Sequence, residues 1–220
     1  MRENLAERAY DILREKIARL EIAPGTALVE KNLCEELDIS RTPVREALRR
    51  LQSEGFCHYA KNVGSIASPL SMEDFQELDE IRVVLEVLSV RLACKTWTDA
   101  EILHQVEEAM MEQISALGEE VVDSKAFLEA DKKFHLLIAH LGGNRHLERQ
   151  LDRVLDLYYR YNYYSAFSPR ALLTLREHMD IVHAVRNRET LLAKSLIEEH
   201  LSSIRTSVLR GLHHGREGSC

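Results

Sequence analysis

The sequence predicts a mostly α-helical chain of two domains: three helices and a small β-hairpin, followed by an all-α bundle of about six helices. Hydrophobic residues make up 45% of the 220 residues, which is enough for packed cores. Nine glycines and four prolines are too few for a turn-rich all-β chain. Apolar residues recur at helical spacing in most segments, and β-prone runs are confined to residues 56–67.

The elements of the first 70 residues follow from periodicity and turn signals. Helical spacing of apolar residues predicts helices over 4–20 and 30–37. Ser40 is a suitable N-cap for a third helix, and Gly55 ends it. Two short β-prone runs then form the hairpin: residues 56–59 and 65–67.

A domain boundary is expected at the connector Ser68-Pro69-Leu70-Ser71. Ser71 and Asp74 form a capping box that opens a new helix. Charge divides at the same place, because residues 1–70 hold 11 basic and 11 acidic residues and residues 71–220 hold 18 and 25. We therefore divide the chain into domains 1–70 and 71–220.

The second domain has helical periodicity throughout. Ser124 and Asn144 are suitable caps, Gly142-Gly143 ends a helix, and Ser168-Pro169 has the N-cap and first-turn proline typical of a helix start. A capping box at Thr98 and a stop at Gly211 complete the prediction. The predicted helices cover residues 72–95, 98–116, 124–141, 144–167, 169–187 and 189–210.

Targeting and membrane signals are absent from the sequence. The first residues are charged, and no segment approaches the roughly 18 uncharged residues needed to cross a bilayer. The four cysteines are scattered without a CxxC pair, which indicates reduced thiols. We expect a cytoplasmic protein without a membrane partner.

The third helix carries a local positive patch, Arg41, Arg45, Arg49 and Arg50 against Glu46. The first three arginines are four residues apart, so they lie on one side of the helix. To bind DNA they must be displayed to solvent and must not be paired with acidic neighbours. An arginine fork pairs bidentately with guanine or with phosphate. Lys61 and the Asn62-Val63-Gly64 tip of the hairpin are suited to an adjacent minor groove. The alternative is a solvated charged helix face, but the order of elements favours DNA.

The segment "GTALVEKNLCEELDISRTPVREALRRLQSEGF" resembles the winged helix-turn-helix of the GntR family of bacterial transcription regulators. The similarity covers about residues 5–68, and "SRTPVREAL" is its most specific part. It implies that Arg41 and Arg45 contact bases or nearby phosphates, that Thr42, Lys31 and Arg49 contact the backbone, and that Gly64 brings the wing tip to the minor groove. It also implies homodimers on near-palindromic double-stranded DNA.

Asp131 and His135 are spaced i, i+4 and can face one point, while His178 and His200 lie on the last two predicted helices. If these helices converge, one carboxylate and three imidazoles surround a divalent cation such as Zn, Ni, Co, Mn or Fe. The alternative is a set of ordinary helix side chains. His140 and His183 fall off these faces and are expected at the surface, and the tyrosine-rich run 158–164 favours core or dimer packing.

Three further segments, "DEIRVVLEVLSVRLA", "EADKKFHLLIAHLGGN" and "REHMDIVHAVRNRETLLAKSLIEEHL", are similar to the FCD domain of the FadR subfamily of GntR regulators, over most of residues 72–212. The metal-binding version of that domain uses an Asp-x-x-x-His pair and two further histidines. The resemblance therefore implies Asp131, His135, His178 and His200 as ligands, and it disfavours a fatty-acyl effector.

Two residues are candidates for effector binding. Arg82 interrupts an apolar helix face; it either pairs with Glu86 or captures an effector carboxylate, and the resemblance favours the second. Asn144 resembles a family position near the pocket, but it is equally suited to cap its helix.

The sequence thus predicts a DNA-binding transcription regulator, most simply a repressor, controlled by a small organic acid bound at a metal site, and not an enzyme. Two alternatives stay open. One is a metal-dependent hydrolase with an accessory DNA-binding domain, although no general base is evident. The other is a regulator whose histidines are structural and hold no metal.

Overall fold

The computed structural model describes residues 4–96, 100–118, 123–165 and 170–217. Its contacts divide the chain into two compact units, Met1–Phe75 and Gln76–Cys220, a few residues after the predicted connector. No helix within these described residues is long and apolar enough to span a membrane. The fold class is as predicted, with mostly helical units and one small hairpin.

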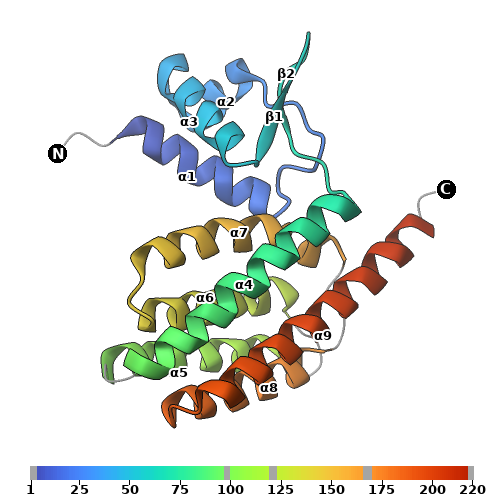
Figure 1. Cartoon of the computed structure of the whole chain (residues 1–220). Helices are drawn as coiled ribbons and strands as arrows, with labels where there is room; N and C mark the ends of the chain where they lie inside the picture. Colours follow the sequence, from blue (N-terminus) through green and yellow to red (C-terminus); the bar gives the residue numbers. More distant parts are fainter. Residues whose placement is uncertain (1–3, 97–99, 119–122, 166–169, 218–220) are drawn as a thin grey trace. The chain divides into compact units, whose positions relative to one another are not determined.

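The N-terminal unit contains α1 (Leu5–Ala18), α2 (Glu30–Leu37) and α3 (Arg41–Ser53), followed by β1 (Cys57–Ala60) and β2 (Gly64–Ala67) (Figure 1). The two strands pair antiparallel, with Cys57 opposite Ala67 and Ala60 opposite Gly64. Helix α1 packs along α3, and the buried residues of this unit include Leu13, Ile17, Val44, Leu51 and Phe56.

Local signals account for the ends of these elements. The Asn4 side chain accepts from the amides of Ala6 and Glu7 at the start of α1. Asp38 takes the left-handed conformation, with φ 53°, in the turn between α2 and α3. Ser40 occupies the N-cap position of α3 as predicted, although its side chain makes no capping hydrogen bond, and Gly55, at φ 90°, follows the helix end.

The C-terminal unit is a bundle in which the described residues form six helices. Helix α5 packs on α6, α6 on α7, α8 on α9, and α7 on α9. The helices are α4 (Met72–Thr96), α5 (Ala100–Ala116), α6 (Ser124–Leu141), α7 (Arg145–Tyr164), α8 (Ala171–Arg186) and α9 (Thr190–Glu217).

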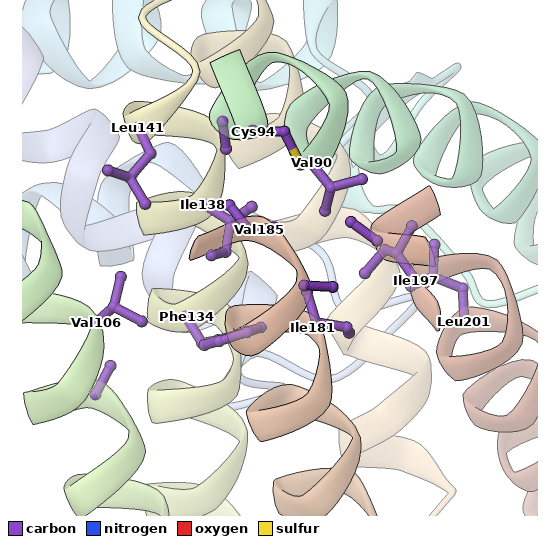
Figure 2. Packing of buried hydrophobic residues seen from close by; sticks show 14 residues of the cluster. Val90, Cys94, Val106, Phe134, Ile138, Leu141, Ile181, Val185, Ile197 and Leu201 are labelled. Carbon is purple, nitrogen blue, oxygen red and sulfur yellow. The ribbon is translucent and has the colours of Figure 1, made fainter. Parts of the chain in front are cut away.

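The core of this bundle draws apolar side chains from five of its helices. Figure 2 shows Val90, Phe134, Ile138, Ile181 and Ile197 among the side chains that meet in a common interior. Phe134 also stacks against the ring of His178, with ring centroids 3.9 Å apart. The hydrophobic core therefore positions the histidine-bearing faces of α6 and α8.

Several predicted helix ends were displaced. Asp123, not Ser124, caps α6, because its carboxylate accepts from the amide of Ala126. Helix α8 begins at Ala171 after Arg170; the predicted cap Ser168 and first-turn Pro169 lie outside the described residues, as does Thr98 before α5.

The predicted stop of the last helix at Gly211 was wrong, because α9 continues to Glu217. A Cβ at Gly211 would lie 2.6 Å from both the Cβ and the carbonyl oxygen of Ser165, at the end of α7. This glycine therefore permits a close approach of two helices and does not terminate one.

Gly211→Ala is expected to lower the free energy of unfolding by up to about 2 kcal/mol. Alanine is better than glycine inside a helix by about 1 kcal/mol. Overpacking against Ser165 costs about 1–3 kcal/mol and outweighs that gain. Denaturant unfolding measures the change, and Arg210→Ala, at the exposed neighbouring position, is the control. A variant more stable than the wild type would contradict the close approach.

Candidate functional site

The first candidate site is the exposed side of α3. Arg41, Thr42, Arg45 and Arg49 are exposed, while Val44 on the opposite side is fully buried in the unit's core. The predicted contacts outside α3 are placed similarly. Lys31 on α2 and Lys61 at the hairpin tip are exposed, and Gly64 is half-buried.

The three aligned arginines differ in their partners. The Arg45 Nε donates to both carboxylate oxygens of Glu30, at 2.9 and 2.7 Å, and its side chain stays 57% exposed. Arg41 and Arg49 make no ion pair within the part of the chain that the structure describes. All three are displayed to solvent as expected, but the expected freedom from acidic partners is wrong for Arg45, which is paired with Glu30.

Arg50 has a different, structural role. Its guanidinium donates to the Glu7 carboxylate at 2.9 Å and lies over the Tyr10 ring, 3.5 Å from the centroid. Glu7 and Tyr10 both belong to α1, so Arg50 ties α3 to α1 and leaves the other three arginines to face outward.

The hairpin tip requires unusual backbone conformations. Asn62 and Gly64 have φ values of 70° and 99°, in the left-handed region that glycine adopts at little cost. No atom lies within 4 Å of a Cβ built on Gly64, so glycine is needed here for its backbone and not for space. The tip is therefore an exposed turn next to Lys61.

The second candidate site is a buried cluster in the helical unit. The ligand nitrogens of His135 on α6, His178 on α8 and His200 on α9 lie within 4.8 Å of one another. Asp131 joins them from one turn before His135, with carboxylate oxygens 3.8 Å from the His135 Nε2 and 3.5 Å from the His178 Nε2. The tertiary fold brings together the four residues predicted as ligands.

Each imidazole is held from its Nδ1 side by a different partner. His135 Nδ1 lies 2.5 Å from Glu86, His178 Nδ1 lies 3.0 Å from the Gln113 amide oxygen, and His200 Nδ1 lies 2.8 Å from Glu177. All three partners are acceptors, so Nδ1 carries the proton and the lone pair sits on Nε2. Among the residues that the structure describes, the buried Nε2 atoms of His178 and His200 have no hydrogen-bond partner.

Burial disfavours the charged form of His178 and His200. Removal from water lowers the pKa of His178 well below its usual value, and the neighbouring imidazoles of His200 and His135 lower it further. Burial also lowers the pKa of His200, although its bond to Glu177 opposes the shift. Neutral imidazoles keep the nitrogen lone pairs that a cation requires.

Asp131 is oriented by two donors. The Tyr159 hydroxyl donates to its Oδ2, and the Gln113 amide nitrogen donates to its Oδ1 at 3.3 Å. Gln113 therefore connects Asp131 with His178. Sequence reasoning missed the roles of Gln113, Tyr159 and Glu177, because each one bonds to a residue on another helix and no local spacing records that contact.

Arg82 lies beside this cluster and is 1% exposed. Its Nε donates to Glu86 at 2.6 Å, a terminal nitrogen lies 3.4 Å from the His135 Nε2, and the guanidinium lies 4.4 Å from the Tyr158 ring centroid. Burial opposes ionisation of Glu86, but His135 and Arg82 outweigh it and lower the pKa of the carboxyl to about 2. Arg82 thus has its predicted ion-pair partner and also borders the histidines.

The remaining predictions fall on the surface or in the core. Asn144 is exposed and caps α7, accepting from the amides of His146 and Leu147, and it makes no hydrogen bond to the histidine cluster. His140 and His183 are exposed and pair with Glu148 and Asn187, as expected of surface residues. Three of the clustered tyrosines are buried: Tyr158, Tyr159 and Tyr161.

A cleft of about 1000 Å³ lies between α5 and α6, and its lining includes none of His135, His178 and His200. Glu107, Glu108, Glu112, Asp123 and Glu129 line it, with Lys133 and His104 as the basic groups. Such an acidic lining repels a carboxylate. The cleft is therefore a poorer site for an organic acid than the buried cluster.

Comparison with known proteins places both units in one family. Residues 5–66 match the family described as bacterial regulatory proteins, gntR family, and residues 77–203 match the FCD domain. The chain is 31% identical to the HTH-type transcriptional repressor RspR of Escherichia coli (strain K12), over 92% of this chain and 88% of that protein. It is 30% identical to the HTH-type transcriptional regulator YdhC of Bacillus subtilis (strain 168), over 94% and 92%.

A solved structure, E. coli McbR/YncC, shares the fold with a TM-score of 0.80 at 22% identity, over 94% of this chain and 98% of that chain. The relatives are transcriptional regulators and not enzymes. This agrees with the prediction of a non-enzyme and removes the support for the hydrolase alternative.

Glu86→Gln is expected to destabilise the protein by about 3 kcal/mol. The amide keeps the volume of the side chain but leaves the buried Arg82 charge without its counter-ion. Denaturant unfolding compares the variant with Glu80→Gln, which removes the same charge from an exposed position of α4. Equal stability of the two variants would show that Arg82 does not depend on Glu86.

Proposed function

This chain is a transcriptional regulator of the gntR family with an FCD domain, and we propose that a small carboxylate bound at a metal site in that domain controls its affinity for DNA. The observation that carries the proposal is the pair of buried, unpartnered Nε2 atoms of His178 and His200. They converge with His135 and Asp131 in a cluster whose rings are already oriented.

The DNA contact is proposed for the exposed side of α3 and the hairpin. Arg41 and Arg45 contact base edges or adjacent phosphates, Lys31, Thr42 and Arg49 contact backbone phosphates, and Lys61 with Gly64 approaches the minor groove. Support comes from the exposure of the charged side chains and from the open backbone at Gly64. A homodimer presents two such surfaces to a near-palindromic operator.

The metal proposal rests on the donor set. Three imidazoles and one carboxylate suit Zn, Ni, Mn, Co or Fe, and outer partners on Nδ1 are the usual companions of metal-bound histidines. His135, His178, His200 and Asp131 would hold the cation, with Glu86, Gln113 and Glu177 orienting the rings. A bound divalent cation supplies open positions that attract a carboxylate oxygen.

Arg82 is the proposed anchor for the effector. It is buried beside His135, and its planar guanidinium suits a carboxylate, although Glu86 shares it. The prediction that Asn144 also contacts the effector has weaker support, because its side-chain oxygen caps α7.

We propose that the protein is a repressor whose effector releases it from DNA. The relative RspR is named a repressor, which supports repression over activation. An effector acts only through different affinities for the DNA-bound and free states, so it must bind the DNA-free form more tightly.

Arg45→Ala is expected to lower affinity for a specific duplex at least about tenfold, because a bidentate base contact is lost. The probe is a duplex that the wild-type protein selects from a random-sequence pool, the selected duplex. Fluorescence anisotropy measures binding, and circular dichroism tests that the fold is retained. The control Arg19→Ala removes the same charge from the C-cap position of α1. Unchanged affinity of the Arg45 variant would refute its proposed role.

Protein purified without chelators is expected to contain about one divalent cation per chain, because four donors converge. Elemental analysis measures the content. His178→Ala should remove most of the metal, while His140→Ala, at an exposed histidine outside the cluster, should retain it. Metal-free wild-type protein that takes up no added cation would instead favour a regulator with structural histidines.

The effector is sought by thermal shift with small mono- and dicarboxylic acids. An acid held through the cation raises the melting temperature of the wild-type protein, and this rise disappears after treatment with chelator. A rise that survives the chelator would separate effector binding from the metal.

A further inference from the structure

The ion pair between Arg45 and Glu30 distinguishes the middle arginine of α3 from its neighbours. Arg41 and Arg49, one turn to either side, make no ion pair with any residue that the structure describes. Arg45 donates through Nε to both oxygens of Glu30, so the contact uses one edge of the guanidinium. The outer edge, formed by the two terminal nitrogens, keeps the two-donor geometry that matches a guanine or a phosphate.

The fold holds Glu30 in place independently of Arg45. Glu30 is the first residue of α2, where the helix dipole stabilises a carboxylate. Helices α2 and α3 pack against each other within the N-terminal unit, so this carboxylate is presented to α3 at a set position. The pair is half-exposed and contributes little to stability, since surface salt bridges are worth about 0–1 kcal/mol.

An acid at this place has a cost for DNA binding. Affinity for any duplex comes mainly from neutralised phosphates, and a carboxylate beside them repels the backbone. Glu30 also neutralises much of the Arg45 charge, which weakens the use of Arg45 as a simple phosphate contact. The same contact removes rotamers of a long side chain before binding, so less conformational entropy is lost when Arg45 meets a matching group.

We propose that Glu30 is a positioning residue that sets the Arg45 guanidinium for a base edge and lowers the affinity of the protein for DNA of other sequences. This inference rests on the proposed function, in which Arg45 contacts DNA. It assigns part of the discrimination between sequences to a pair of residues, one on each helix of the helix-turn-helix.

The test compares Glu30→Gln with the wild type on two probes, the selected duplex and a random-sequence duplex of equal length. Glutamine keeps the size of the side chain but loses the charge that holds Arg45. The matched control is Glu36→Gln, which removes one charge from the same helix at a residue paired with Lys16 on α1. Binding is measured over a series of salt concentrations.

For Glu30→Gln we expect the ratio of the two affinities to fall about tenfold, the scale of one misplaced base contact. Affinity for the random duplex should rise, and its salt dependence should steepen by about 0.9 in log–log slope for each arginine released to a phosphate. Glu36→Gln should leave the ratio unchanged. A merely structural role of Glu30 would not alter the salt slope.

Glu30→Asp keeps the charge but shortens the reach to Arg45. If Glu30 positions Arg45, this variant also loses discrimination, while its affinity for the random duplex stays closer to that of the wild type. An unchanged ratio in Glu30→Gln overturns the proposal. So does an equal rise on both probes, because Glu30 would then only compete with DNA for Arg45.

Arg45→Ala, measured in parallel, distinguishes a failure of the proposed DNA contact of Arg45 from a failure of the proposed role of Glu30. If it binds the selected duplex like the wild type, the proposed DNA contact itself fails. If it loses specific binding while Glu30→Gln behaves like Glu36→Gln, the contact stands and only the role of Glu30 is refuted.

Discussion

The helical unit depends on a set of buried hydrogen bonds to the Nδ1 atoms of three histidines. These bonds orient each ring so that its Nε2 atom faces the centre of the cluster. Unpaired polar atoms in a packed core are costly, so the partners on the Nδ1 side are as necessary as the histidines. Glu86, Gln113 and Glu177 come from three different helices. The bundle therefore contains a preformed polar site within an apolar interior.

Charge within this site is balanced locally. Arg82 and Glu86 neutralise each other in a buried pair, and Glu177 is paired with Arg170 as well as His200. Asp131 receives two donors instead of a counter-ion. This arrangement leaves one carboxylate and three imidazole rings facing the shared space, which is a donor set that can accept a cation.

The N-terminal unit differs from the helical unit, because its proposed functional side chains are exposed and have few hydrogen-bond partners. Arg50 is tied to α1 and takes part in the fold, whereas Arg41 and Arg49 are left to solvent. Arg45 lies between these cases, exposed but oriented by Glu30. Arginines that bind DNA need an intermediate degree of restraint. A fully paired arginine has no charge left for DNA, and an unrestrained arginine has no fixed orientation toward a base.

The sequence by itself determined the helices, the hairpin and the local pairing of Asp131 with His135, because caps, periodicity and i, i+4 spacing act within a few residues. It also placed the aligned arginines on one side of α3. His178 and His200 were candidates from their place on the last two predicted helices, and the family resemblance supported them. Only the tertiary structure decided that His178 meets Gln113 from 65 residues away, that Arg45 meets Glu30 and that α9 continues past Gly211. Those contacts join separate elements, and no local pattern records which elements will pack together.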